Sequence, residues 1–81
     1  AIGIVRLLAG ISAAVFVRET KDGKAKVSLR SKSELNVAEI CAAFGGGGHV
    51  KAAGCLIDAN AEEAVKTVVE AISSAISRGE Q

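Results

Sequence analysis

Two stretches with the pattern of β-strands flank a short turn sequence, and this arrangement constrains the fold more than any other feature of the chain. Residues 11–19 are rich in β-branched residues and Ala, whereas residues 24–31 alternate between polar and apolar side chains. The connection, Thr20–Gly23, contains Asp-Gly, which is a strong hairpin signal because Gly accepts the positive φ that the turn requires. The sequence therefore predicts an antiparallel pair of strands, the second of which carries a polar, basic face.

The remainder of the chain predicts two helices and one more strand. Asn36 can cap a helix that ends at Gly45, and a Glu at the third helical position completes a capping box. Residues 55–57 form a short apolar segment that is typical of a buried strand. A second amphipathic helix is predicted to begin after Asn60 and to end near Gly79.

This order of elements (strand, strand, helix, strand, helix) predicts the α/β class. We expect a small mixed β-sheet with the N-terminal antiparallel hairpin and with the helices packed on one face. Residues 11–79 are expected to form the domain itself. Residues 1–10 are interpreted as a linker or as a leading strand from an upstream domain that is missing from this chain.

Composition and charge limit the classes of function. The chain of 81 residues is long enough for one small domain, whose core must be built from Val, Ile, Leu and Ala because Phe16 and Phe44 are its only aromatic residues. A net charge of +1 excludes the strong global field of a non-specific nucleic-acid binder. Basic residues nevertheless outnumber acids in residues 18–32, and acids outnumber basic residues in 58–81. The basic region can meet an anion, and the alternative is a solvated strand face that carries Lys for solubility and edge protection.

The two cysteines, Cys41 and Cys55, lie in apolar surroundings. We therefore expect both to be reduced core residues of a cytoplasmic protein. Together with His49 they offer three soft ligands without paired spacing, so no structural metal site is expected. The longest uncharged stretch, residues 7–17, is too short to span a bilayer, and we expect no association with membranes.

Four consecutive glycines, Gly45–Gly48, are followed by His49 and Lys51. One glycine suffices to cap a helix, and each further one costs about 0.5–1 kcal/mol of backbone entropy relative to Ala. Such a cost is expected where backbone amides approach a ligand, and a nest of consecutive amides binds anions. The alternatives are a flexible connector and a KH-type Gly-x-x-Gly loop between two helices. The sequence shows no Ser-His-Asp arrangement, carboxylate pair or metal cluster, so we expect this chain alone to be non-catalytic.

Three segments together resemble a known family: Val27-Ser-Leu-Arg-Ser31, a short capped helix ending in Phe44, and the run Gly-Gly-Gly-Gly-His-Val-Lys-Ala-Ala-Gly54. The pattern resembles the DHH-associated C-terminal domain (DHHA1) of DHH-family phosphoesterases, and the likeness covers residues 10–77. That family includes RecJ-type exonucleases, oligoribonucleases with phosphoadenosine-phosphate phosphatase activity and cyclic-dinucleotide phosphodiesterases. The resemblance implies that a separate N-terminal DHH domain, absent from this chain, holds the catalytic manganese.

The resemblance also implies a role for this domain, which is to bind substrate at the cleft between the two domains. The residues implied to do so are Arg30, Ser31, Gly46, Gly47, Gly48 and His49. The expected function is that of a substrate-binding accessory domain, which holds the end of a nucleotide or oligoribonucleotide during phosphodiester or 3′-phosphate hydrolysis. The expected partners are a nucleotide or short single-stranded nucleic acid and the DHH domain, with a homodimer left open and no cofactor in this chain. The alternative is an independent single-strand-binding module of KH type.

Overall fold

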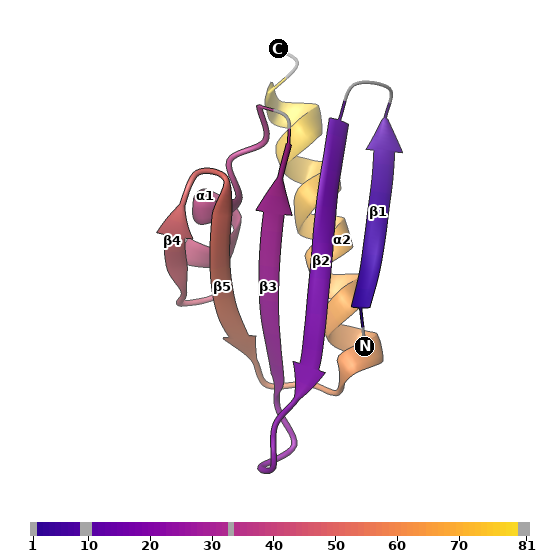
Figure 1. Cartoon of the computed structure of the whole chain (residues 1–81), viewed down its shortest axis with the longest axis vertical. Helices are drawn as coiled ribbons and strands as arrows, with labels where there is room; N and C mark the ends of the chain where they lie inside the picture. Colours follow the sequence, from indigo (N-terminus) through magenta and orange to yellow (C-terminus); the bar gives the residue numbers. More distant parts are fainter. Residues whose placement is uncertain (1, 9–10, 33, 80–81) are drawn as a thin grey trace.

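A five-stranded sheet forms the framework of the fold (Figure 1). The computed structural model describes residues 2–8, 11–32 and 34–79, and it describes side chains for residues 13–32 and 34–78. The strand order across the sheet is β1-β2-β3-β5-β4, so β4 and β1 are the edge strands. The elements in chain order are β1 (Ile2–Leu8), β2 (Ile11–Glu19), β3 (Ala25–Ser31), α1 (Val37–Ala42), β4 (Gly47–His49), β5 (Ala52–Ile57) and α2 (Ala61–Gly79).

The expected hairpin of β2 and β3 is confirmed. The two strands pair antiparallel from Ala13 opposite Ser31 to Glu19 opposite Ala25. At the turn, the amide of Gly23 donates to the carbonyl of Thr20 at 3.1 Å, and Gly23 adopts a φ of 80°. A residue with a Cβ would be strained in this conformation, which is why Asp-Gly predicted the turn correctly.

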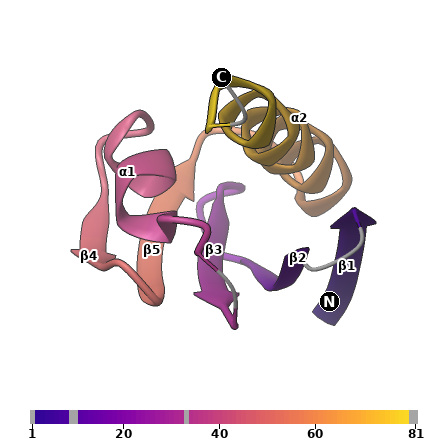
Figure 2. The ribbon, with the colours of Figure 1, turned by 90° about the horizontal axis from the view of Figure 1, so that it is seen from above.

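Both helices cover one face of the sheet, as expected, and the α/β class is confirmed (Figure 2). The sheet differs from the expected mixed arrangement because all four strand pairs in the described structure are antiparallel. The difference comes from β4, a strand of three residues in a segment whose sequence predicts a loop. This strand reverses the chain once more after α1, so β5 enters the sheet antiparallel to β3 rather than parallel to it.

The sequence allows two interpretations of residues 1–10, a linker or a leading strand. The structure has a strand at this place, because β1 pairs antiparallel with β2 from Ile2 opposite Phe16 to Leu8 opposite Ile11. The pairing shifts register between Val5 and Leu8. The β1 strand therefore belongs to the same sheet as the rest of the domain.

The helices begin where their capping residues predict. The side chain of Asn36 accepts a hydrogen bond from the amide of Glu39 at 3.1 Å, and that of Asn60 accepts one from Glu63 at 2.8 Å. The long helix α2 then places four residues at helical spacing against the sheet, and all of them are buried: Ala64, Val68, Ile72 and Ile76. Neither helix of the described chain combines the length and apolar character needed to cross a membrane.

The two cysteines are free and buried in the core between α1 and β5. Burial raises the pKa of the Cys41 thiol from its ordinary value of 9.0 to about 12, and the neighbouring Cys55 adds to this increase. Burial also raises the pKa of Cys55. Both thiols are therefore held in the protonated form that a closely packed apolar core favours.

Stability should consequently decline in alkaline solution. Because the folded protein retains the Cys41 proton more tightly than the unfolded chain does, the stabilisation is complete below pH 9.0 and is lost as the pH rises toward about 12. Urea unfolding at several pH values should show the free energy of unfolding falling more steeply in the wild type than in Cys41→Ala. Parallel pH profiles for the two proteins would show that this thiol is not responsible.

Candidate functional site

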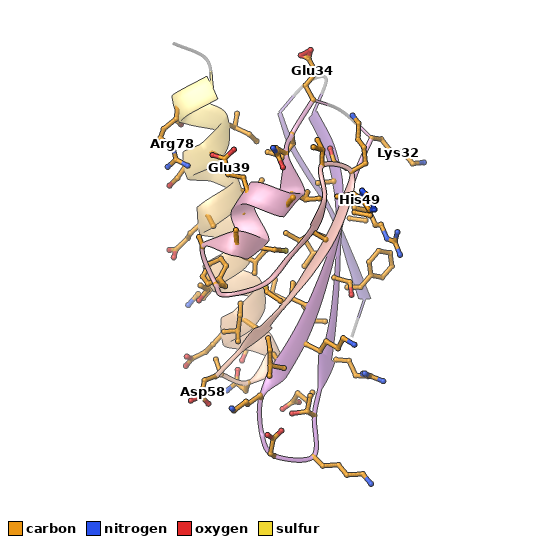
Figure 3. The ribbon with its side chains drawn as sticks, turned by 90° about the vertical axis from the view of Figure 1, so that its left-hand side faces the viewer. Lys32, Glu34, Glu39, His49, Asp58 and Arg78 are labelled. Atoms are coloured by element: carbon orange, nitrogen blue, oxygen red, sulfur yellow. The ribbon has the colours of Figure 1, made fainter. Side chains whose placement is uncertain are left out.

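The sheet face that points away from both helices is the candidate site, and we call it the open face. Strand alternation assigns its residues: Val15 and Leu29 are buried on the helix side, whereas their neighbours Phe16 and Arg30 face the other way. Figure 3 shows His49 on the side of the sheet away from α2. The described residues of the open face are Ala14, Phe16 and Arg18 on β2, Lys26, Ser28 and Arg30 on β3, Gly47 and His49 on β4, and Ala52, Gly54 and Leu56 on β5.

The charged side chains among the described residues of the open face are all positive. Its ionised side chains are Arg18, Lys26 and Arg30, and none of the described residues assigned to it is Asp or Glu. The described acids lie elsewhere. Glu19 ends β2 at a position that alternates with the open face, and the others are on the hairpin tip, α1, α2 and the connecting loops. Figure 3 shows Glu39 on the helix side of the sheet, with Arg78 close to it. A domain with a net charge of only +1 thus presents one basic surface, which favours the anion-binding interpretation of the charge pattern.

Register brings Arg30 and His49 together on this face. Arg30 pairs with Ala52 across β3 and β5, and Ala52 pairs with His49 across β5 and β4. The Cα atoms of Arg30 and His49 are therefore separated by two strand spacings, about 10 Å. Because the small side chain of Ala52 stands between them, the guanidinium and imidazole groups can contact the same ligand.

The next row of the open face is nearly flat. On β3, β5 and β4, Ser28 pairs with Gly54, and Gly54 pairs with Gly47, so two of these three residues have no side chain. A shallow pocket of about 280 Å³ forms there. Its lining consists of Ser28, Arg30, Gly47, Gly48, Ala52, Ala53 and Gly54. The pocket is large enough for a phosphate or a sugar, and Arg30 is one of its lining residues.

The first two glycines of the run have structural roles. Gly45 has a φ of 83°, its amide donates to Ala42 at 3.0 Å, and the amide of Gly46 donates to Cys41 at 2.9 Å. These two bonds form a Schellman motif, so Gly45 ends α1 in the left-handed conformation that the sequence predicted. At Gly46 a Cβ would lie 2.2 Å from the carbonyl oxygen of Gly54. Gly46 therefore permits close packing against β5.

The last two glycines differ from each other. Gly48 has a φ of 148°, and a Cβ there would lie 2.7 Å from the carbonyl oxygen of Ala52. A Cβ on Gly47 would meet nothing within 4 Å, since this position faces the pocket. The run is thus a helix cap followed by a paired strand. It does not form the expected nest of consecutive amides, because successive amides of a strand point in opposite directions.

The structure does not bring the Ser31 side chain to the open face. Ser31 lies one residue after Arg30 on β3, and it is 7 % exposed on the helix side. Its amide donates to the carbonyl of Lys51 at 3.0 Å, which extends the pairing of β3 with the β4–β5 turn. The hydroxyl next to Arg30 on the open face is that of Ser28, which is not among the residues predicted from the sequence. The period of two along a strand was the signal that could have found it.

Metal-binding side chains are not clustered in the described part of the chain. No group of three or more His, Cys, Asp or Glu residues there is arranged to hold a metal ion.

Comparison with known proteins assigns the fold and the motif to a family. The sequence pattern of the DHHA1 domain matches residues 1–78. The chain therefore belongs to the DHHA1 domain family, which confirms the resemblance read from the sequence. A Thermus thermophilus protein, the bifunctional oligoribonuclease and PAP phosphatase NrnA, is 35 % identical over 78 residues. The match covers 95 % of this chain but only 24 % of the relative.

The KH-type alternative is not favoured. A KH loop joins two helices, whereas Gly45–Gly48 leads from α1 into the strand β4. The family match supports the same conclusion.

Proposed function

We propose that this domain holds the phosphate and sugar at the end of a nucleotide or oligoribonucleotide for a DHH-family phosphoesterase. The observation that carries the proposal is the register that aligns Arg30, Ala52 and His49 beside the glycine-lined pocket. The relative from Thermus thermophilus bears the name of an oligoribonuclease and PAP phosphatase, and this supports a nucleotide as the ligand.

Each group of the site suits a part of this ligand. The Arg30 guanidinium can donate two parallel hydrogen bonds to a phosphate, and His49 can donate a third from its ring. The Ser28 hydroxyl can both donate and accept, which suits a ribose hydroxyl. The missing side chains at Gly47 and Gly54 let the sugar lie against the backbone of the sheet. We expect a dissociation constant between about 1 mM and tens of μM, because few groups contribute and ligand freedom is lost.

The proposed division of labour leaves hydrolysis to a DHH domain. Metal ions bound by that domain would activate water, and the DHHA1 domain would position the substrate. The chain alone is then expected to bind nucleotide without hydrolysing it. The reduced, buried cysteines suit a cytoplasmic setting for the whole enzyme.

Filling the pocket from Gly47 tests the proposal. A Cβ at this position meets no neighbour, so Gly47→Ala and Gly47→Val should fold normally while adding bulk where the ligand would lie. Calorimetric titration with adenosine monophosphate should show a graded loss of affinity, about threefold for Ala and about tenfold or more for Val. Undiminished binding by Gly47→Val, with wild-type thermal stability, would show that the ligand does not occupy this pocket.

A further inference from the structure

Two cations stand directly opposite each other on the open face, away from the pocket. Arg18 on β2 pairs with Lys26 on β3, and both side chains are exposed. Like charges directly opposite across two strands destabilise a sheet. No Asp or Glu among the described open-face residues compensates them. The two cations therefore repel each other in the free domain, and an anion bound between the two side chains would relieve this repulsion.

Protection of a sheet edge does not explain these residues. Lysines commonly blunt an edge strand against aggregation. Here β2 and β3 are interior strands with a partner on each side. The remaining explanation is solubility. Solubility does not require two cations to lie directly opposite each other, as Arg18 and Lys26 do.

The pair is too far from Arg30 to contact the same phosphate. Lys26 precedes Arg30 by four residues on β3, which corresponds to about 13 Å along the strand. Both side chains nevertheless lie on one face because they differ by an even number of residues. Any anion held by Arg18 and Lys26 is accordingly a second one.

An aromatic residue lies between the two positive sites. Phe16 pairs with Ser28, which is midway between Lys26 and Arg30. Its side chain is half-buried on the open face, and its neighbours Val15 and Val17 point into the core. The same row continues through Gly54 to Gly47, so no bulky side chain on β5 or β4 stands in its way. A nucleobase can stack on an aromatic ring placed in this way.

We propose that the open face binds at least three successive nucleotides of a single strand. One phosphate lies at Arg30 and His49, a base contacts Phe16, and a phosphate further along the strand lies between Arg18 and Lys26. This inference rests on the proposed function, and it extends that function from a nucleotide end to a short oligonucleotide track. The oligonucleotide is held through its phosphates and one base, without a contact that selects its sequence.

The affinities of one set of variants for two ligands, a mononucleotide and a trinucleotide, test whether the open face has this second phosphate site. The ligands are adenosine monophosphate and the RNA trinucleotide of adenylate, titrated into the 81-residue chain at two salt concentrations. In Arg18→Thr/Lys26→Thr the trinucleotide should bind about tenfold more weakly, whereas the monophosphate should bind within about twofold of wild type. The salt dependence of trinucleotide binding should also decrease, by about 0.7 in the logarithmic slope for each phosphate that the variant no longer neutralises.

Two further variants complete the experiment. Phe16→Leu keeps an apolar side chain but removes the ring, and it should weaken the trinucleotide by about fivefold. Lys21→Thr removes a cation at the hairpin tip and should change neither affinity. The melting temperature of the double Thr variant should equal or exceed that of wild type, because repulsion between the opposed cations is relieved.

The possible results separate this inference from the proposed function. Equal trinucleotide affinity in wild type and the double Thr variant overturns the second phosphate site, while the proposed function stands if adenosine monophosphate still binds. Failure of wild type to bind either ligand overturns both proposals. If Lys21→Thr lost as much trinucleotide affinity as the double Thr variant, the loss would come from the overall charge of the domain. This result would also overturn the second phosphate site.

Discussion

Gly46→Ala should destabilise the fold by about 3 kcal/mol or more. The added Cβ would lie 2.2 Å from the carbonyl oxygen of Gly54 and 2.7 Å from the Cβ of Cys55. Both neighbours belong to β5, which is paired on each side and cannot move without breaking its pairing with β3 or β4. Urea denaturation should show a large decrease in the midpoint for this variant.

Gly47→Ala is the matched control for this prediction. It makes the same chemical change one residue later, where the Cβ would meet nothing within 4 Å. Its free energy of unfolding should differ from that of wild type by less than about 1 kcal/mol. Equal destabilisation by the two substitutions would indicate a general requirement for loop flexibility instead of a specific close approach at Gly46.

Arg30→Ala should remove most of the affinity for adenosine monophosphate. A charge-assisted hydrogen bond contributes about 1.5–3 kcal/mol, so the loss should be at least about tenfold. The Arg30 side chain is exposed on the open face, and its removal should leave the core intact. Calorimetric titration at low salt measures the change directly.

Lys21→Ala removes the same charge from the same hairpin and serves as the control. Lys21 lies at the exposed tip between β2 and β3, away from the pocket-lining residues. Its affinity for adenosine monophosphate should stay within about twofold of wild type. If Lys21→Ala weakened binding as much as Arg30→Ala does, long-range charge would account for binding and the site at Arg30 would not exist.

Local signals in the sequence predicted the elements whose causes are local. Asp22-Gly23 specified the hairpin because a positive φ was needed at Gly23, and that φ is 80°. Asn36 and Asn60 marked the starts of both helices because their side chains accept amide hydrogen bonds three residues ahead. In each case the decisive interaction lies within four residues, so the sequence contains all of it.

The features that escaped prediction depend on pairing between distant segments. β4 consists of glycines and one histidine, and it becomes a strand only because β5 offers a partner. Successive amides of the paired β4 strand point in opposite directions, so β4 does not form the expected nest of amides around an anion. The family resemblance implied both Arg30 and Ser31 as binding residues, yet adjacent residues of a strand point to opposite faces. The alternation along β3 was visible in the sequence, whereas the alignment of Arg30 with His49 required the register of three strands.

An NMR titration of the isotopically labelled chain with adenosine monophosphate tests the central claim most directly. The claim predicts that amides around the pocket shift progressively as the ligand is raised past about 1 mM, while amides of α2 stay in place. The residues to follow are Ser28, Arg30, Gly47 and Ala52, which line the pocket, and His49, which pairs with Ala52. Shifts confined to the helices, or no shift at these positions at saturating ligand, would contradict a nucleotide-binding site on the open face.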